Sequence, residues 1–407
     1  MTDFAYSPPH DDAADAARML ARVGTGALAL GVPATAGVAG NSMAIVFAIG
    51  LALLFAAEAL DPAPGVGRRF QGLRFSLLAL AVVAMAAWAL ASLSWTPFVT
   101  PGLRRIGAVA VIGVPAFVAI MAARPHIRAA DLYLFPVGVC VAMAATLALE
   151  VAGLNGVAVN AAATDNLAVA VVVMAFPAMA GLSARGRNGL ARSLMVLALI
   201  YTRIAGPPAA TAALLAGLAA FSFALSDAPR TIRDLGILSA LLVLAAPFVP
   251  LAAPGLVHLV AGADIALLPQ PGPALAAVAD VEHGEPLRLL TGHGVEAMVR
   301  AFKGGVLPPA APHGLVFQVW YDFGFVGAAI LAFGLWRAFL GIDEAAPRIQ
   351  PYLLAGFACV LTLAFTNSGW GEQSWVILVA TAAIAADCAL RGVYASRAPA
   401  AVGAAHF

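Results

Sequence analysis

Long apolar runs recur along the whole chain, separated by short polar or Pro/Gly-rich segments. Runs such as 77–91 and 167–180 are apolar on every side and do not alternate with a period of two. A helix needs roughly 20 mostly apolar residues to cross a bilayer, and backbone groups in hydrocarbon must pair within helices or closed barrels. Barrel strands would alternate at every second residue. The pattern therefore predicts an all-α, polytopic integral membrane protein.

The runs predict about twelve transmembrane helices. Their approximate ranges are 21–38, 41–60, 74–94, 104–122, 131–151, 166–183, 191–205, 208–225, 235–252, 314–340, 351–367 and 373–391. Gly31, Pro33 and Gly37 interrupt the first range. Because only a Gly-Pro-Pro turn at 206–208 separates the seventh range from the eighth, these two form either separate spans or one tight hairpin.

Charge is sparse and unevenly distributed. Charged residues make up 11% of the chain and hydrophobic residues 62%, and the net charge of +1 gives no field that would attract nucleic acid. With the N-terminus in the cytoplasm, the inner segments hold 16 of the 22 basic residues, which follows the positive-inside rule. We therefore predict a multi-pass membrane protein with both termini in the cytoplasm. The basic residues left on the outer side are Arg104, Arg105, Arg203, Arg288, Arg300 and Lys303.

One outer connection is much longer than the others. It covers 253–313, and loops of this length are usually functional or disordered. It contains apolar residues at helical spacing around Val295, Met298 and Phe302, with Glu296 and Arg300 four positions apart as in a helical ion pair. We expect a partly helical external cap. The predicted parts are a cytoplasmic tail (1–18), transmembrane helices (19–252), a large periplasmic loop (253–313), further transmembrane helices (314–393) and a second cytoplasmic tail (394–407).

Arginines on the outer side are the first candidates for chemistry. Arg203 ends a predicted helix near the bilayer surface, and Arg288 and Arg300 flank the loop sequence Gly292-His293-Gly294. Guanidinium groups bind phosphate oxygens in a bidentate manner, and a Gly-x-Gly segment lets backbone approach a ligand closely. The plainer alternatives are a snorkelling arginine at position 203 and a solvated face for the loop cluster.

Two more polar residues lie where the chain re-enters the membrane. His313 starts the tenth predicted helix and can accept a proton near neutral pH, although it can equally be an ordinary polar residue at a helix start. Asp322 lies two to three turns further on, where a buried charge is costly, so it is expected to bond to Trp320 or to another helix. Arg104 and Arg105 are interpreted as a surface pair, with a position near a phosphate as the less favoured alternative. No spacing typical of a metal site is present, and no cofactor is expected.

These motifs together resemble the O-antigen ligase and O-antigen polymerase superfamily, the membrane glycosyltransferases of bacterial surface polysaccharides. Its signature is Gly-x-Gly in a large periplasmic loop, then a His, then a helix start of the form Leu-x-x-x-x-Glu-x-Gly-x-x-Gly. The similar positions here are 292–294, His313 and 317–327, with Asp322 in place of the Glu and Gly314 where an Asn usually follows the His. The family's arginine at an outer helix end resembles Arg203, and its Ser-x-x-Trp-Ser stretch resembles 92–96.

The resemblance implies a protein of the bacterial inner membrane that transfers a glycan from undecaprenyl diphosphate to an acceptor hydroxyl, such as that of lipid A–core, at the periplasmic face. Arg203 and Arg288, with Arg300 in reserve, would bind the diphosphate, and His313 would act on the hydroxyl. The reaction would invert the anomeric carbon without a metal. Two alternatives stay open: a polymerase of the same superfamily and, from another class, a membrane transporter or permease.

Overall fold

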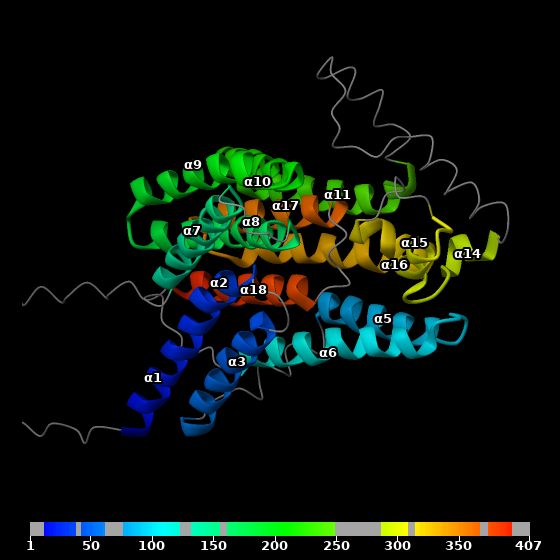
Figure 1. Ribbon diagram of the computed structural model, residues 1–407, viewed down its shortest axis with the longest axis horizontal. Coiled ribbons are helices and arrows are strands. Elements are labelled where there is room, and N and C mark those ends of the chain that lie inside the picture. Colours follow the sequence, from blue (N-terminus) through cyan, green and yellow to red (C-terminus); the bar gives the residue numbers. More distant parts are fainter. Residues whose placement is uncertain are drawn as a thin grey trace, which may run out of the picture.

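The computed structural model describes residues 12–37, 42–61, 76–122, 132–154, 161–248, 286–307, 314–366 and 373–392, and within these ranges every regular element is a helix (Figure 1). The first part of the chain forms α1 (Asp12–Gly26), the π-helical turn η1 (Ala27–Gly31), α2 (Val32–Thr35), α3 (Ser42–Leu60), α5 (Leu77–Ser92), α6 (Val99–Ala122), α7 (Leu134–Leu154) and α8 (Ala161–Ala184). The second part forms α9 (Asn188–Ala205), α10 (Pro208–Ser226), α11 (Ala228–Ala245), η3 (Ala246–Phe248), α14 (Pro286–Thr291), α15 (Ala297–Lys303), α16 (Leu315–Gly341), η4 (Ile342–Glu344), α17 (Gln350–Thr366) and α18 (Gln373–Gly392).

Each of the twelve predicted ranges corresponds to a helix, but the first one begins earlier than expected. Part of the predicted polar tail belongs to α1, which starts at Asp12 and carries its acidic residues in the first turn, where they complement the helix dipole. Gly31 and Pro33 do not end the helix, because η1 continues the backbone into α2, whose second residue is Pro33. The helix ends at Thr35, two residues before Gly37. At Gly31 a Cβ atom would lie 2.5 Å from Val46 Cγ1, so the glycine permits close packing on α3.

The seventh and eighth ranges are two helices, α9 and α10. Gly206 has an extended backbone, and Pro208 starts α10 without needing an N–H partner. α11 also has a proline in its first turn, and the Asp227 side chain caps it by accepting a hydrogen bond from Arg230 N.

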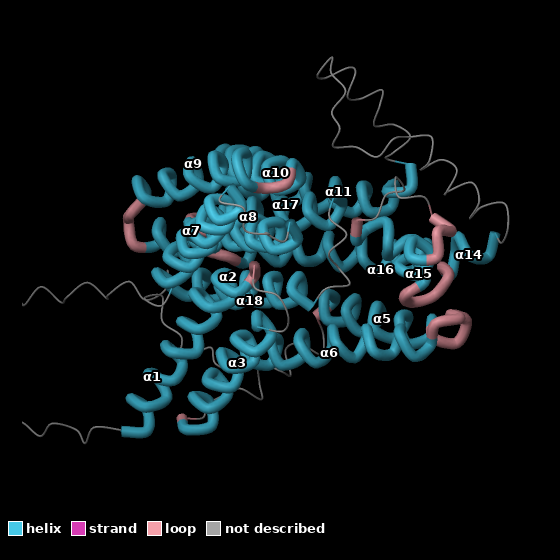
Figure 2. Tube along the Cα trace, in the orientation of Figure 1, coloured by secondary structure: helices cyan, strands magenta, loops and turns pink. Residues whose placement is uncertain are grey.

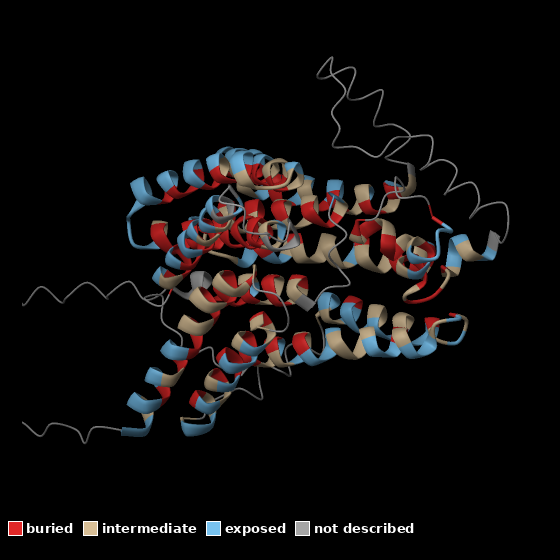
Figure 3. Cartoon of the chain, viewed as in Figure 1, coloured by how far each residue is buried: buried red, intermediate tan, exposed pale blue. Residues whose placement is uncertain are grey.

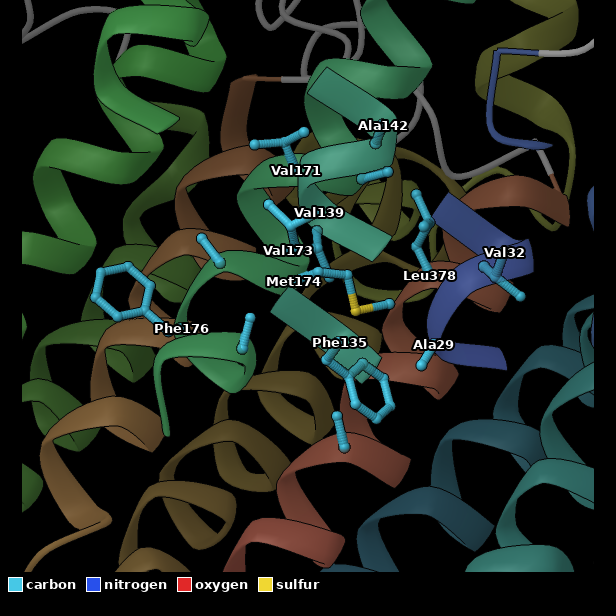
Figure 4. Close-up of a cluster of buried hydrophobic side chains, with 14 of the residues drawn as sticks. Ala29, Val32, Phe135, Val139, Ala142, Val171, Val173, Met174, Phe176 and Leu378 are labelled. Carbon is cyan, nitrogen blue, oxygen red and sulfur yellow. The ribbon is translucent and has the colours of Figure 1, made fainter. Parts of the chain in front are cut away.

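α8 is the central helix of the fold. It packs against α7, α9, α10, α17 and α18, and 89% of its apolar span is buried (Figure 3). The Met174 side chain points toward Phe135 on α7 and Leu378 on α18, whereas Phe176 points to the opposite side (Figure 4). There the centre of the Phe176 ring lies 6.3 Å from that of Phe221 on α10. An all-round apolar sequence thus has a simple explanation here, because the helix has neighbours on all sides.

The outer helices expose apolar side chains such as Val111 and Ile204, each about three-quarters exposed, which suits a lipid environment. Among the residues that the structure describes, five helices are long and apolar enough to cross a membrane: Ser42–Leu60, Val99–Ile120, Thr164–Ala184, Pro208–Ser226 and Leu315–Glu344. Four shorter apolar helices accompany them in the described part of the chain. The described part of the chain is therefore all-α, and its long apolar helices fit a membrane protein, while the number of twelve spans and their sidedness stay predictions.

One end of the bundle gathers the elements that matter for chemistry. α16 packs against α5, α11 and α14, and α15 also lies on it. The α5–α6 turn and the segment joining α14 to α15 lie at the same end, on the right of Figure 2. This is the end at which the sequence predicts the outer surface.

Candidate functional site

A break in α16 organises this end of the molecule. Gly324 has φ 63° and ψ −162° within an otherwise helical segment. The three carbonyl groups before the break accept hydrogen bonds from outside the helix. Tyr321 O accepts from His293 N at 2.9 Å, Asp322 O from Gly294 N at 2.8 Å, and Phe323 O from Trp88 Nε1 at 3.0 Å. The loop and α5 therefore satisfy the backbone that the break would otherwise leave unpaired, as hydrocarbon requires.

Gly292 and Gly294 permit this contact. Their φ angles are 74° and 92°, in the region that favours glycine. A Cβ atom on Gly292 would overlap the Asp322 carbonyl group, and one on Gly294 would lie 2.5 Å from Thr96 Cβ. The close approach predicted for Gly-x-Gly is therefore made to other protein segments. Between the glycines, the His293 ring stacks on the Tyr321 ring at a centroid distance of 4.4 Å.

The α5–α6 turn closes the other side of the loop. Thr96 Oγ1 donates to Val295 O at 3.1 Å, and Val295 N donates to Ser92 Oγ at 3.3 Å. Ser92 and Thr96 are buried. These residues belong to the Ser-x-x-Trp-Ser-like stretch, so three motifs of the resemblance lie together in space: 92–96, 292–294 and the N-terminal half of α16.

A buried polar network links the same three elements. Arg105 Nη1 lies 2.8 Å from Glu296 Oε1, and Arg105 Nη2 lies 3.3 Å from Gln318 Oε1. Gln318 Nε2 donates to Asp322 Oδ2 at 3.3 Å, and Met298 N donates to Asp322 Oδ1 at 2.9 Å. Burial raises the cost of each charge, and the paired donors and acceptors offset it.

This network changes two interpretations made from the sequence and decides between the alternatives in a third. Asp322 was expected to bond to Trp320 or to another helix. It accepts from Met298 N of α15 as well as from Gln318, while the Trp320 indole donates to Val243 O at 2.7 Å. Glu296 pairs with Arg105 and not with Arg300, because it lies just before α15 in a left-handed conformation. Arg105 is therefore not a surface residue. The sequence signal for a buried role of Arg105 is its predicted position on the outer side, where basic residues are less common.

The predicted arginines are only partly brought together. Arg288 on α14 and Arg300 on α15 both lie on elements that pack against α16. The Arg300 side chain is exposed, with its guanidinium 5.8 Å from the centre of the Phe98 ring. Arg203 is exposed at the end of α9, which packs on α7, α8 and α10, and no described residue forms a hydrogen bond or ion pair with its guanidinium. Its role in the site stays a prediction.

His313 lies outside the described residues, but its neighbour Gly314 is informative. A Cβ atom at Gly314 would overlap the Phe365 carbonyl group at the end of α17. The backbone of α17 therefore occupies the space that a side chain at this position would need. Among the described residues no group of His, Cys, Asp or Glu is arranged to hold a metal ion.

Comparison with known proteins adds no family to this description. No protein-family model, no curated protein and no solved structure matches the chain. What the described residues define is a helical fold whose apolar helices fit a membrane.

Proposed function

We propose that the chain is a membrane glycosyltransferase of the O-antigen ligase kind, which moves a glycan from undecaprenyl diphosphate to an acceptor hydroxyl at the periplasmic face. The observation that carries the proposal is the backbone pairing of 292–294 with Tyr321 and Asp322. Two motifs of the resemblance are thereby joined, although the segment containing His313 separates them in sequence. Arg288 and Arg300 lie on α14 and α15, the short helices that flank Gly-x-Gly and pack against α16.

The residue types suit the reaction. The acceptor oxygen attacks the anomeric carbon, the bond from that carbon to the diphosphate oxygen breaks, and the hydroxyl proton passes to His313. Negative charge then grows on the leaving diphosphate. Fixed guanidinium groups such as Arg288 and Arg203 would stabilise that charge, and they do so more strongly away from bulk water.

A polymerase of the same superfamily would use the same chemistry on a different acceptor. A deletion strain separates the two activities. Loss of a ligase leaves lipid-linked polymer to accumulate, whereas loss of a polymerase leaves single repeat units.

A transporter is the alternative from another class, and the break at Gly324 beside a buried Asp322 is the observation that favours it. In transporters with broken helices, the freed carbonyl groups coordinate the transported ion. Here the carbonyl groups of Tyr321, Asp322 and Phe323 already accept hydrogen bonds from protein donors. We therefore prefer glycan transfer. Substrate-dependent flux in proteoliposomes, without transfer, would reverse this preference.

The proposal is tested with His313→Ala and Arg203→Ala in cells that lack the native gene. Both variants should insert normally and abolish glycan transfer, measured as the profile of lipopolysaccharide on gels. Arg192→Ala is the matched control, because Arg192 is exposed near the opposite end of α9. Full activity of both test variants would remove these residues from the mechanism.

A further inference from the structure

We propose that Arg105 is a positioning residue that clamps α15, and with it Arg300, against α16. The inference rests on the proposed function, and it assigns a role to a residue outside the motifs of the resemblance. One guanidinium bridges Glu296, just before α15, and Gln318 on α16, at 2.8 Å and 3.3 Å. The side chains of Arg105 and Glu296 are each only 14% exposed.

The clamp continues through Asp322. Its two carboxylate oxygens accept from Met298 N in the first turn of α15 and from the Gln318 side chain. The start of α15 is thus held from two directions, by α6 through Glu296 and by α16 through Met298. A helix of this length is not stable by its own hydrogen bonds, so its position depends on such contacts.

The conformation of Glu296 is a second, independent observation. Its φ of 71° makes it the one residue other than glycine with a positive φ among those that the structure describes. Glycine would adopt this conformation more easily. A side chain at this position is therefore expected to make an interaction that glycine cannot make, and that interaction is the ion pair with Arg105.

The clamp determines where Arg300 lies. Met298 and Ala301 pack into a small apolar cluster with Phe317 and Tyr321, which holds one face of α15. Arg300 lies over Phe98, one residue before α6 begins. Phe98 adjoins α6, which carries Arg105, and Glu296 adjoins α15, which carries Arg300. The Arg105–Glu296 ion pair therefore holds α15 against α6 and keeps Arg300 close to Phe98. A guanidinium can bridge two acceptors in one plane, and a lysine cannot replace this geometry.

The test measures the clamp and the reaction separately in the full-length protein. The clamp is measured by placing a cysteine at Ala301, which is buried on the inner face of α15, and by following its modification by a maleimide with mass spectrometry. The reaction is measured as kcat and KM for the undecaprenyl-diphosphate-linked donor in proteoliposomes. The variants are Arg105→Ala, Arg105→Lys, Glu296→Gln and Glu296→Ala, with Arg104→Ala as the exposed neighbouring control.

We expect Arg105→Ala and Glu296→Ala to speed the modification and to lower kcat/KM by about 100-fold, the loss typical of truncating one partner of a buried charge pair. Arg105→Lys should also be defective although it keeps the charge. Glu296→Gln should stay within about fivefold of wild type, because its amide oxygen still accepts from Arg105 and the Arg105 charge still balances Asp322. Arg104→Ala should match wild type in both measurements.

Three results would overturn the inference: unchanged modification in Arg105→Ala, faster modification with unchanged kcat/KM, or a fully active Arg105→Lys. Reduced protein yield without a change in either measurement of the surviving protein would also count against it, since it indicates a purely structural role. A wild-type protein without transfer activity would overturn the proposed function instead. The cysteine modification would then still decide whether Arg105 holds α15.

Discussion

Replacing Gly292 by alanine should detach the loop from α16, whereas the same change at Gly305 should not. The two glycines have nearly equal φ angles, 74° and 72°. They differ in their surroundings, because a Cβ atom on Gly292 would overlap the Asp322 carbonyl group and one on Gly305 would meet nothing within 4 Å. The pair therefore separates the cost of the backbone conformation from the cost of the close approach.

The expected magnitudes follow from these contacts. Both variants carry the cost of a left-handed alanine, roughly 1–2 kcal/mol. In Gly292→Ala the loop must also move away from α16, which breaks the bonds from His293 N to Tyr321 O and from Gly294 N to Asp322 O. Each buried group left without a partner adds about 1–3 kcal/mol. The free energy that keeps the loop closed should therefore fall by roughly 3–8 kcal/mol in Gly292→Ala.

Hydrogen exchange measured by mass spectrometry on detergent-solubilised protein reports this opening directly. A loss of 3 kcal/mol or more should speed exchange at His293 and Gly294 by over about 100-fold, while Gly305→Ala leaves both amides protected. Peptides from α8 serve as an internal control, since they should exchange equally in both variants. Equal exchange at His293 in the two variants would refute the argument that the Gly292 contact holds the loop.

Two further predictions concern the same end of the bundle. Trp88→Phe removes the donor to Phe323 O and should destabilise the protein by about 1–3 kcal/mol, whereas Trp95→Phe should cost less, because the Trp95 indole N–H has no hydrogen-bond partner among the described residues. Thermal unfolding in one detergent compares them, and equal losses would contradict the assignment. A membrane-impermeant maleimide should modify Lys303→Cys and not Arg187→Cys from the periplasmic side, and the reverse pattern would invert the predicted topology.

The helices of the membrane-spanning part were predictable because apolar periodicity is a local property. Met174 and Phe176 lie on a helix that is apolar on all sides, and that helix is buried on all sides. The start of α1 was not found, because its stretch around Asp12 and Asp15 is too polar to resemble a span. Its buried residues, Ala17 and Ala21, are small and give a weak apolar signal.

The polar network could not be predicted in the same way, since its partners are far apart in sequence. Arg105 and Glu296 are separated by 191 positions. The sequence instead indicated an ion pair between Glu296 and Arg300, which requires both to lie on one helix. The left-handed conformation of Glu296 removes it from that helix, and no sequence pattern predicts a positive φ at a glutamate.

The glycines show how a correct local expectation can have a different consequence. Gly-x-Gly is expected to let backbone approach a ligand closely. In the structure the close approach is between the loop at Gly292 and α16 at Gly324, because a Cβ atom on Gly324 would lie 2.5 Å from Gly292 N. The amides of His293 and Gly294 already donate to carbonyl groups of α16 and are not free to bind a phosphate. If this site binds a diphosphate, the binding groups must therefore be side chains, and the glycines serve to fix the segment that carries them. Substitutions at the glycines should then change the position of the arginines, while substitutions at the arginines should change affinity and leave the loop closed.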